Sequence, residues 1–158
     1  MYPLSYLIGW KRFKDGAWFE PSDQPSLEQM IELLELKKSD VVVDLGSGDG
    51  TVVLEIAKNG ASAYGIERDP KLVAASRESI AAQGLAKKAK IIEASLWDYD
   101  LSQFNKVAVY QFKTVMRRLE QKLLSELPKG AMVVSNYWNF PSWKVDKTLG
   151  YVRRYIKS

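Results

Sequence analysis

The chain has 158 residues, 46% of them hydrophobic and 27% charged, values that predict a single globular domain with a sizeable core. It contains no cysteine and no histidine, which excludes disulfides, thiolate chemistry and imidazole as a general base or metal ligand. The formal net charge of +4 is concentrated in residues 141–158, where basic residues outnumber acidic ones. Such a basic end suits either a solvated edge or contact with RNA, an acidic protein or a membrane surface.

Residues 1–10 are apolar in places, but basic residues follow them and no cleavage site of small residues is present. A secretory signal is therefore not expected, and about ten residues are too few for a bilayer span, which takes about 20. We expect residues 1–25 to form an N-terminal segment that packs on a domain of residues 26–158, with peripheral membrane contact as the alternative. The predicted location is the cytoplasm.

Strands and helices are predicted to alternate from Ser26 onward. Residues 26–29 have the pattern of a capping box, and Asp69 with Pro70 predicts a second helix start. Predicted helices cover residues 26–36, 51–57, 70–83 and 113–127, and predicted strands cover residues 41–45, 61–67, 90–94, 106–111 and 131–137.

This order is typical of an α/β fold with a single-domain, doubly wound, Rossmann-like sheet. Such a sheet is mostly parallel and binds its ligands beyond the carboxyl ends of the strands. At the end of the chain, residues 143–148 and 151–156 are predicted either as a short antiparallel edge or as one strand with a frayed tail.

The strongest motif is Asp-Leu-Gly-Ser-Gly-Asp-Gly at residues 44–50, directly after a run of three valines. Its small residues are Gly46, Ser47, Gly48 and Gly50, and glycines let the backbone bend tightly and approach a ligand without a Cβ in the way. The spacing is not the G-x-G-x-x-G of a dinucleotide site, and Asp44 and Asp49 would sit poorly beside a pyrophosphate. Because the sulfonium and ammonium of S-adenosylmethionine suit neighbouring carboxylates, the motif predicts S-adenosylmethionine as the cofactor.

Glu67 ends the second predicted strand, where its carboxylate could accept hydrogen bonds from both ribose hydroxyls of a nucleoside. Arg68 follows it and belongs to the predicted cofactor site, although an exposed turn around this acid is the alternative. After the third strand, Ser95 is placed to meet the edge of an adenine, and Leu96 or Trp97 to cover its face. Trp97 could equally be a core residue.

Tyr110, Gln111 and Phe112 end the fourth predicted strand, at the position that faces a departing methyl group. Tyr110 could orient an acceptor, accept a proton through water or place its ring near a cation, or it could simply close an apolar floor. Four more aromatic residues follow the fifth strand: Tyr137, Trp138, Phe140 and Trp143. They could line an acceptor channel or pack against the final edge, and packing is favoured for Phe140 and Trp143.

Together these motifs resemble the class I S-adenosylmethionine-dependent methyltransferases and, over most of the chain, the small protein-lysine methyltransferases. The resemblance rests on Gly-Ala-Trp-Phe-Glu-Pro-Ser at 16–22, the glycine motif, Gly-Ile-Glu at 65–67, Val-Tyr at 109–110, Val-Val-Ser at 133–135 and Phe-Pro-Ser-Trp at 140–143. It implies that Phe19, Pro21 and Ser22 close over the cofactor, with Ser22 standing where the family usually has threonine.

The resemblance also implies that Tyr110 lies at the methyl-transfer site. Gln111 and Phe112 stand where the family usually has two leucines. Asn136 replaces a common histidine, and Thr51 a common arginine. The candidate catalytic residues are therefore Tyr110, Gln111 and Asn136, and the departures concern the acceptor rather than the cofactor.

The implied reaction is in-line transfer of a methyl group to the amine of a protein lysine, in which positioning supplies most of the rate and neither histidine nor metal is needed. A methyltransferase acting on RNA or DNA bases is the first alternative. The Asn/Asp-Pro-Pro-aromatic turn common in such enzymes is absent after the fourth strand, but the basic C-terminal end keeps nucleic acid open as a partner. A non-catalytic nucleoside-binding module is the second alternative.

Overall fold

The computed structural model describes residues 20–158, so Phe19 lies outside the described residues. Its helices are α1 (Gln24–Leu34), α2 (Thr51–Lys58), α3 (Pro70–Ala82), the short 3₁₀ helix η2 (Lys113–Val115) and α4 (Met116–Glu126). Its strands are β1 (Val41–Leu45), β2 (Ser62–Glu67), β3 (Ala89–Glu93), β4 (Lys106–Val109), β5 (Met132–Asn136), β6 (Lys147–Leu149) and β7 (Val152–Ile156). Within this described part, no helix has both the length and the apolar character needed to cross a membrane.

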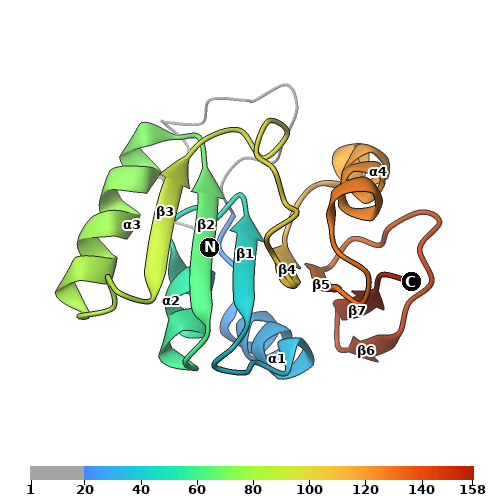
Figure 1. Ribbon diagram of the computed structural model, residues 1–158, viewed down its shortest axis with the longest axis horizontal. Helices are drawn as coiled ribbons and strands as arrows, with labels where there is room; N and C mark the ends of the chain where they lie inside the picture. Colours follow the sequence, from blue (N-terminus) through green and yellow to red (C-terminus); the bar gives the residue numbers. More distant parts are fainter. Residues whose placement is uncertain (1–19) are drawn as a thin grey trace.

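The strands form one sheet in the order β3-β2-β1-β4-β5-β7-β6 (Figure 1). The first five strands pair in parallel, and β7 pairs antiparallel with both β5 and β6. The predicted doubly wound, mostly parallel sheet is confirmed, and of the two endings considered, the antiparallel hairpin is the one that forms.

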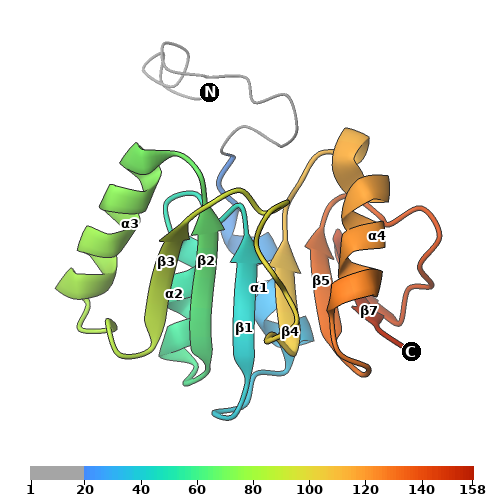
Figure 2. The same ribbon diagram turned by 45° about the horizontal axis from the view of Figure 1, so that its top comes forward.

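Hydrophobic layers cover both faces of the sheet. On one face, α1, α2 and α3 contribute side chains such as Met30 and Val73, and on the other α4 contributes side chains such as Leu119. Within β1, Val42 belongs to the first layer and Val43 to the second, which explains why consecutive valines are needed there. Figure 2 shows α1 and α2 behind the strands and α4 in front of them. Because both faces are covered, we expect ligands to bind at the edge where the parallel strands end.

The first helix begins before the predicted capping box. Asp23 is its N-cap, with a carboxylate oxygen that accepts a hydrogen bond from Ser26 N at 2.8 Å, and Pro25 lies in the first turn. The prediction of a cap at Ser26 is therefore wrong. An acid two residues before a proline is an equally good start signal, and it places Ser26 inside the helix, where it is buried.

Replacing Asp23 with alanine should lower the free energy of unfolding by about 1 kcal/mol, the usual cost of removing an N-cap side chain. Urea denaturation measures this difference. Glu32→Ala, an exposed change within the same helix, is the control and should stay within about 0.5 kcal/mol of the parent chain. Equal losses in the two variants would contradict capping by Asp23.

The helix predicted over residues 113–127 is divided. It opens as η2, closed by a hydrogen bond from Val115 N to Phe112 O at 3.0 Å, and continues as α4. Leu127 has extended backbone with ψ of 148° and ends α4, because the following Pro128 disfavours the helical region for the residue before it.

Several basic residues at the end of the chain are held by the fold. Arg154 forms ion pairs with Glu35 at 2.7 Å and Asp146 at 2.6 Å. Arg153 donates to two backbone carbonyl oxygens of neighbouring loops, and Lys157 donates to the carbonyl oxygen at the end of α4. These contacts give much of the basic end a structural role within the domain.

Candidate functional site

The predicted site residues gather where the parallel strands end, and in Figure 2 the arrowheads of β1 to β5 all point to that edge. The strand order reverses at β1, with β2 and β3 on one side and β4 and β5 on the other. In open α/β sheets such a switch point opens the crevice in which ligands bind. The site therefore has a β1–β2 half and a β4–β5 half.

The glycine motif forms a tight turn from β1 into α2. Gly46 N and Ser47 N both donate to Ile66 O, at 2.9 and 3.0 Å, and so tie the turn to β2. The φ angles of Gly46, Gly48 and Gly50 are +82°, +56° and +82°, in the left-handed region that favours glycine. The turn needs these glycines for its own shape, and it brings the amino end of α2 to the switch point.

The Ser47 side chain packs against β2. A Cβ on Gly65 would lie 2.4 Å from Ser47 Oγ and 2.7 Å from Ile91 Cδ1, so glycine at 65 makes room for this serine. Ser47 Oγ is buried and has no hydrogen-bond partner among residues 20–158. Ser47 N and Ser47 O are also engaged, with Ile66 O and Gly50 N, so this residue shapes the turn.

Ser76 of α3 supports the turn from behind and was missed by sequence reasoning. Its buried hydroxyl donates to Gly48 O at 2.9 Å, with Leu72 O at 2.7 Å as a second acceptor, and Gly50 lies against its Cβ. The only signal was a small polar residue on the buried side of a predicted helix, which by itself names no partner.

Glu67 is held by three backbone N–H groups. Its Oε2 accepts from Gly48 N at 2.9 Å, and its Oε1 accepts from Arg68 N at 2.8 Å and Asp69 N at 2.9 Å. A carboxylate has about four lone-pair positions, so one remains for a further donor. Arg68 contributes its backbone to this arrangement. Glu67 thus joins the glycine turn to the start of α3. It keeps one acceptor position for a ligand, whereas the sequence suggested hydrogen bonds to both ribose hydroxyls.

Asp44 lies in β1 immediately before the turn and is only 6% exposed. Burial, together with the negative charges of Glu67 and Asp49, raises the pKa of its carboxyl from 3.8 to about 8. A buried carboxyl with acidic neighbours is stabilised in its ionised form by a nearby cation. This half of the site therefore favours a positively charged ligand.

The residues predicted to meet an adenine follow β3 and form a turn in which Ser95 accepts two hydrogen bonds from backbone N–H groups of the same turn. Ser95 Oγ accepts from Trp97 N at 3.3 Å, and Ser95 O accepts from Asp98 N at 3.1 Å. The guanidinium of Arg118, on α4, lies 4.0 Å from the centre of the Trp97 ring and covers one of its faces. Sequence reasoning missed this stacking contact, which leaves half-buried Leu96 as the other candidate to cover a base.

Gln111 lies between β4 and the glycine turn. It is buried, its Nε2 donates to Leu45 O at 3.1 Å, and a Cβ on Gly46 would come within 2.4 Å of that nitrogen. This geometry makes Gln111 a residue that positions the turn. Tyr110, half-buried beside it, directly follows β4, which ends at Val109 rather than at the predicted Gln111, and so lies in the second half of the site.

Asn136 ends β5 and meets the segment before α1. Its Nδ2 donates to Ser22 Oγ at 3.4 Å, so a residue predicted to cover the cofactor lies next to a candidate catalytic residue, while Pro21 is exposed. After Asn136 the chain turns sharply, because Tyr137 has φ of +69° and Trp138 N donates to Asn136 O at 2.9 Å. This turn directs Tyr137 outward, where 51% of it is exposed.

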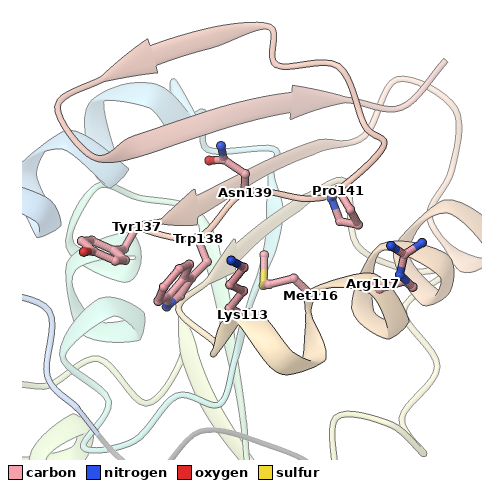
Figure 3. A pocket seen from close by; sticks show the side chains of 7 residues that line it. All are labelled: Lys113, Met116, Arg117, Tyr137, Trp138, Asn139 and Pro141. Carbon is pink, nitrogen blue, oxygen red and sulfur yellow. The ribbon is translucent and has the colours of Figure 1, made fainter.

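The aromatic residues after β5 divide into two groups. Phe140 and Trp143 pack the edge as favoured, with ring centres 4.9 and 5.5 Å from that of buried Tyr155. Tyr137 and Trp138 instead line a pocket of about 490 Å³ (Figure 3). The other lining residues are Lys113, Met116, Arg117, Asn139 and Pro141.

Comparison with known families bears on this arrangement. A family model described as the ANTKMT methyltransferase domain matches residues 44–147, a range that takes in the glycine turn, Glu67, Tyr110 and Asn136. The chain belongs to this family.

Relatives of this ANTKMT-family chain include the ATP synthase c-subunit lysine N-methyltransferase of Rattus norvegicus, 35% identical over 132 residues that cover 84% of this chain and 61% of the relative. A protein-lysine N-methyltransferase of Saccharolobus islandicus is 28% identical over 127 residues, 79% of each chain. The crystal structure of an RNA methyltransferase from Salinibacter ruber, in complex with S-adenosyl-L-homocysteine, has 32% identity and a TM-score of 0.84, covering 87% of this chain and 93% of that one. This chain spans only 53–61% of the mammalian ATP synthase methyltransferases that it matches.

The ANTKMT-family site has acceptors that fit a cationic nucleoside. Glu67 keeps one acceptor position, and burial beside two acids makes Asp44 favour a positive charge. Within residues 20–158, no three acidic, histidine or cysteine side chains are grouped so that they could hold a metal ion.

Proposed function

We propose that this ANTKMT-family chain transfers the methyl group of S-adenosylmethionine to the side-chain amine of a protein lysine. The observation that carries the proposal is the meeting of the glycine turn, the tethered Glu67 carboxylate and Tyr110 at one switch point, within the family match. The relatives named as protein-lysine N-methyltransferases support this class of acceptor.

When bound, S-adenosylmethionine supplies a methyl group already activated on a positively charged sulfur. In the proposed site the backbone carbonyl groups of residues 46–50 would hold the ammonium of its amino-acid end, the remaining acceptor position of Glu67 would take a ribose hydroxyl, and Asp44 would provide the negative charge. Gln111 keeps the turn in place from the β4 side. These groups orient a reactant and do not exchange protons with it, which suits a chain without histidine.

On the β4–β5 side, the acceptor lysine must lose its proton before it can attack, since its pKa is about 10.4 in water. Partial burial beside Tyr110 and the positive charges of Lys113 and Arg117 both disfavour the ammonium form. The proposed site would therefore help to present a neutral amine to the bound cofactor.

Incubation with radiolabelled S-adenosylmethionine and a cell extract tests the proposal. We expect label in protein that survives nuclease treatment and that yields methyl-lysine after hydrolysis. Label that nuclease removes, and that also appears on purified RNA, would replace the lysine by a nucleic-acid base. Binding of S-adenosylhomocysteine by calorimetry, with no label in any fraction, would indicate a non-catalytic module.

RNA methylation is the second candidate, because the Salinibacter ruber relative named as an RNA methyltransferase covers most of the chain. The residues after β4 read Tyr-Gln-Phe-Lys and lack the Pro-Pro-aromatic turn of many base methyltransferases, which favours lysine. The cytoplasm remains the proposed location.

Replacing Tyr110 with phenylalanine should lower the turnover number about ten-fold, because the ring stays while the hydroxyl that orients the amine is lost. Affinity for S-adenosylhomocysteine should change less than about two-fold, since Tyr110 lies on the β4–β5 side of the site. Single-turnover kinetics and calorimetry give the two values. Unchanged turnover would remove the Tyr110 hydroxyl from the mechanism.

A further inference from the structure

The pocket beside β5 has a charge pattern that cofactor binding does not use. Lys113 and Arg117 are the ionic residues among its lining side chains, and both are cations. Figure 3 shows Lys113 between Trp138 and Met116, with Arg117 farther along the pocket near Pro141. A volume of about 490 Å³ is ample for a side chain of a bound protein segment.

The pocket belongs to the acceptor half of the site. Lys113 comes shortly after Tyr110 at the end of β4, and Trp138 comes shortly after Asn136 at the end of β5. Both strands lie on the far side of β1 from β2, whose end carries Glu67. A substrate segment bound at Tyr110 therefore lies on the same half of the site as the pocket.

Acids within residues 20–158 form no ion pair with these cations. Glu120, one helical turn after Arg117, is buried, and both of its oxygens accept from Ser142 N, at 2.9 and 3.3 Å. It is thus engaged in holding the loop that forms the pocket wall. Of the ion pairs between described residues, none includes Lys113 or Arg117. Lys113 Nζ lies over the Trp138 ring, 6.0 Å from its centre.

We propose that this pocket binds the side chain of an aspartate or glutamate close in sequence to the target lysine of the substrate protein. This inference rests on the proposed function. Two cations at the pocket attract a carboxylate, and one that lies a few residues from the target lysine can reach the pocket while the amine itself is at Tyr110, which does not line it. The planar guanidinium of Arg117 can bind a carboxylate through two hydrogen bonds, and Lys113 adds a second charge. Trp138 and Tyr137 can cover the methylene groups of the bound side chain.

The test maps the lysines that are methylated. A cell extract is incubated with S-adenosylmethionine carrying an isotopically heavy methyl group, and modified lysines are located by mass spectrometry. We expect Asp and Glu to be enriched within about four residues of these lysines, roughly the length of an extended segment across the pocket. Charge-reversed variants, Lys113→Glu and Arg117→Glu, should methylate the acid-flanked sites about ten-fold more slowly.

Matched controls separate recognition from folding. Lys144→Glu reverses an exposed cation that does not line the pocket and should leave the sites unchanged. Arg117→Gln removes the charge without reversing it and should have a smaller effect of the same kind. All variants should bind S-adenosylhomocysteine as the parent chain does, since that measurement reports an intact domain.

Two negative outcomes differ. Methyl-lysine formed without acidic enrichment, or with a site preference that charge reversal leaves unchanged, overturns the pocket assignment and leaves the proposed function standing. Heavy methyl groups found on RNA alone overturn both, and would assign the cations to backbone phosphates instead.

Discussion

Replacing Glu67 with glutamine is expected to weaken binding of S-adenosylhomocysteine by about 100-fold or more. The carboxylate accepts hydrogen bonds from Gly48 N, Arg68 N and Asp69 N, and the proposed cofactor adds a ribose hydroxyl. Glutamine keeps one oxygen, and its amide nitrogen would face backbone donors. Each buried N–H group left without an acceptor costs about 1–3 kcal/mol, so the glycine turn loosens at the same time as the sugar contact is lost. Isothermal titration calorimetry measures the affinity.

The natural control for this change is Glu93→Gln. Glu93 ends β3 directly opposite Glu67 in the register of the parallel pair, but it is exposed. It has the same charge, the same side-chain length and the same edge of the sheet, without the bonds to the turn. Its affinity should stay within about two-fold of the parent chain. Similar affinities for the two variants would show that the tether and the sugar contact assigned to Glu67 do not matter.

The fold could be predicted because its signals are local. A run of valines predicts a strand buried on both faces, alternating glycines predict the turn after it, and Asp69 with Pro70 marks a helix start that the structure has at that place. The one wrong helix start arose where two good caps lie three residues apart, at Asp23 and Ser26. Local patterns establish that a helix begins there, but the choice between adjacent caps depends on which side chain the core buries.

The site was less predictable because its contacts join distant positions. Ser76 supports Gly48 across 28 residues, and Gln111 reaches Leu45 across 66. The residues next to either partner in the sequence do not indicate which distant residue it contacts. Similarly, Arg117 has the pattern of a solvated helix face, and only the sharp turn at Tyr137 places aromatic side chains opposite it. Local patterns therefore predict the glycine turn and Glu67 on the β1–β2 side, whereas the contacts of the half built from two strand ends required the fold.

Cofactor affinity is expected to rise with pH up to about pH 8, and Asp44 is the reason. Burial and the charges of Glu67 and Asp49 raise the pKa of its carboxyl from 3.8 to about 8, so the unliganded site holds a proton at neutral pH. A ligand that carries a sulfonium and an ammonium favours the ionised carboxylate, and binding therefore releases that proton. Between pH 6 and 8 the affinity for S-adenosylmethionine should rise by up to about ten-fold per pH unit, and it should level off above that range.

The variant Asp44→Asn isolates this contribution, because it mimics the protonated form and cannot ionise. The ligand's own amine titrates identically with both proteins, so the difference in slope between parent chain and variant belongs to Asp44.

The stability of the unliganded protein should change with pH in the opposite direction. The pKa of Asp44 is higher in the folded chain than in the unfolded chain, so the folded chain binds the proton more tightly. The stability gained from this tighter binding is fully present below about pH 4 and is lost as pH rises toward 8. As pH rises from 5 to 8, the variant should therefore become more stable than the parent chain in urea titrations. Over the same range its affinity for the cofactor should fall below that of the parent chain. Parallel pH profiles for the two proteins, in both measurements, would mean that Asp44 is already ionised in the free site.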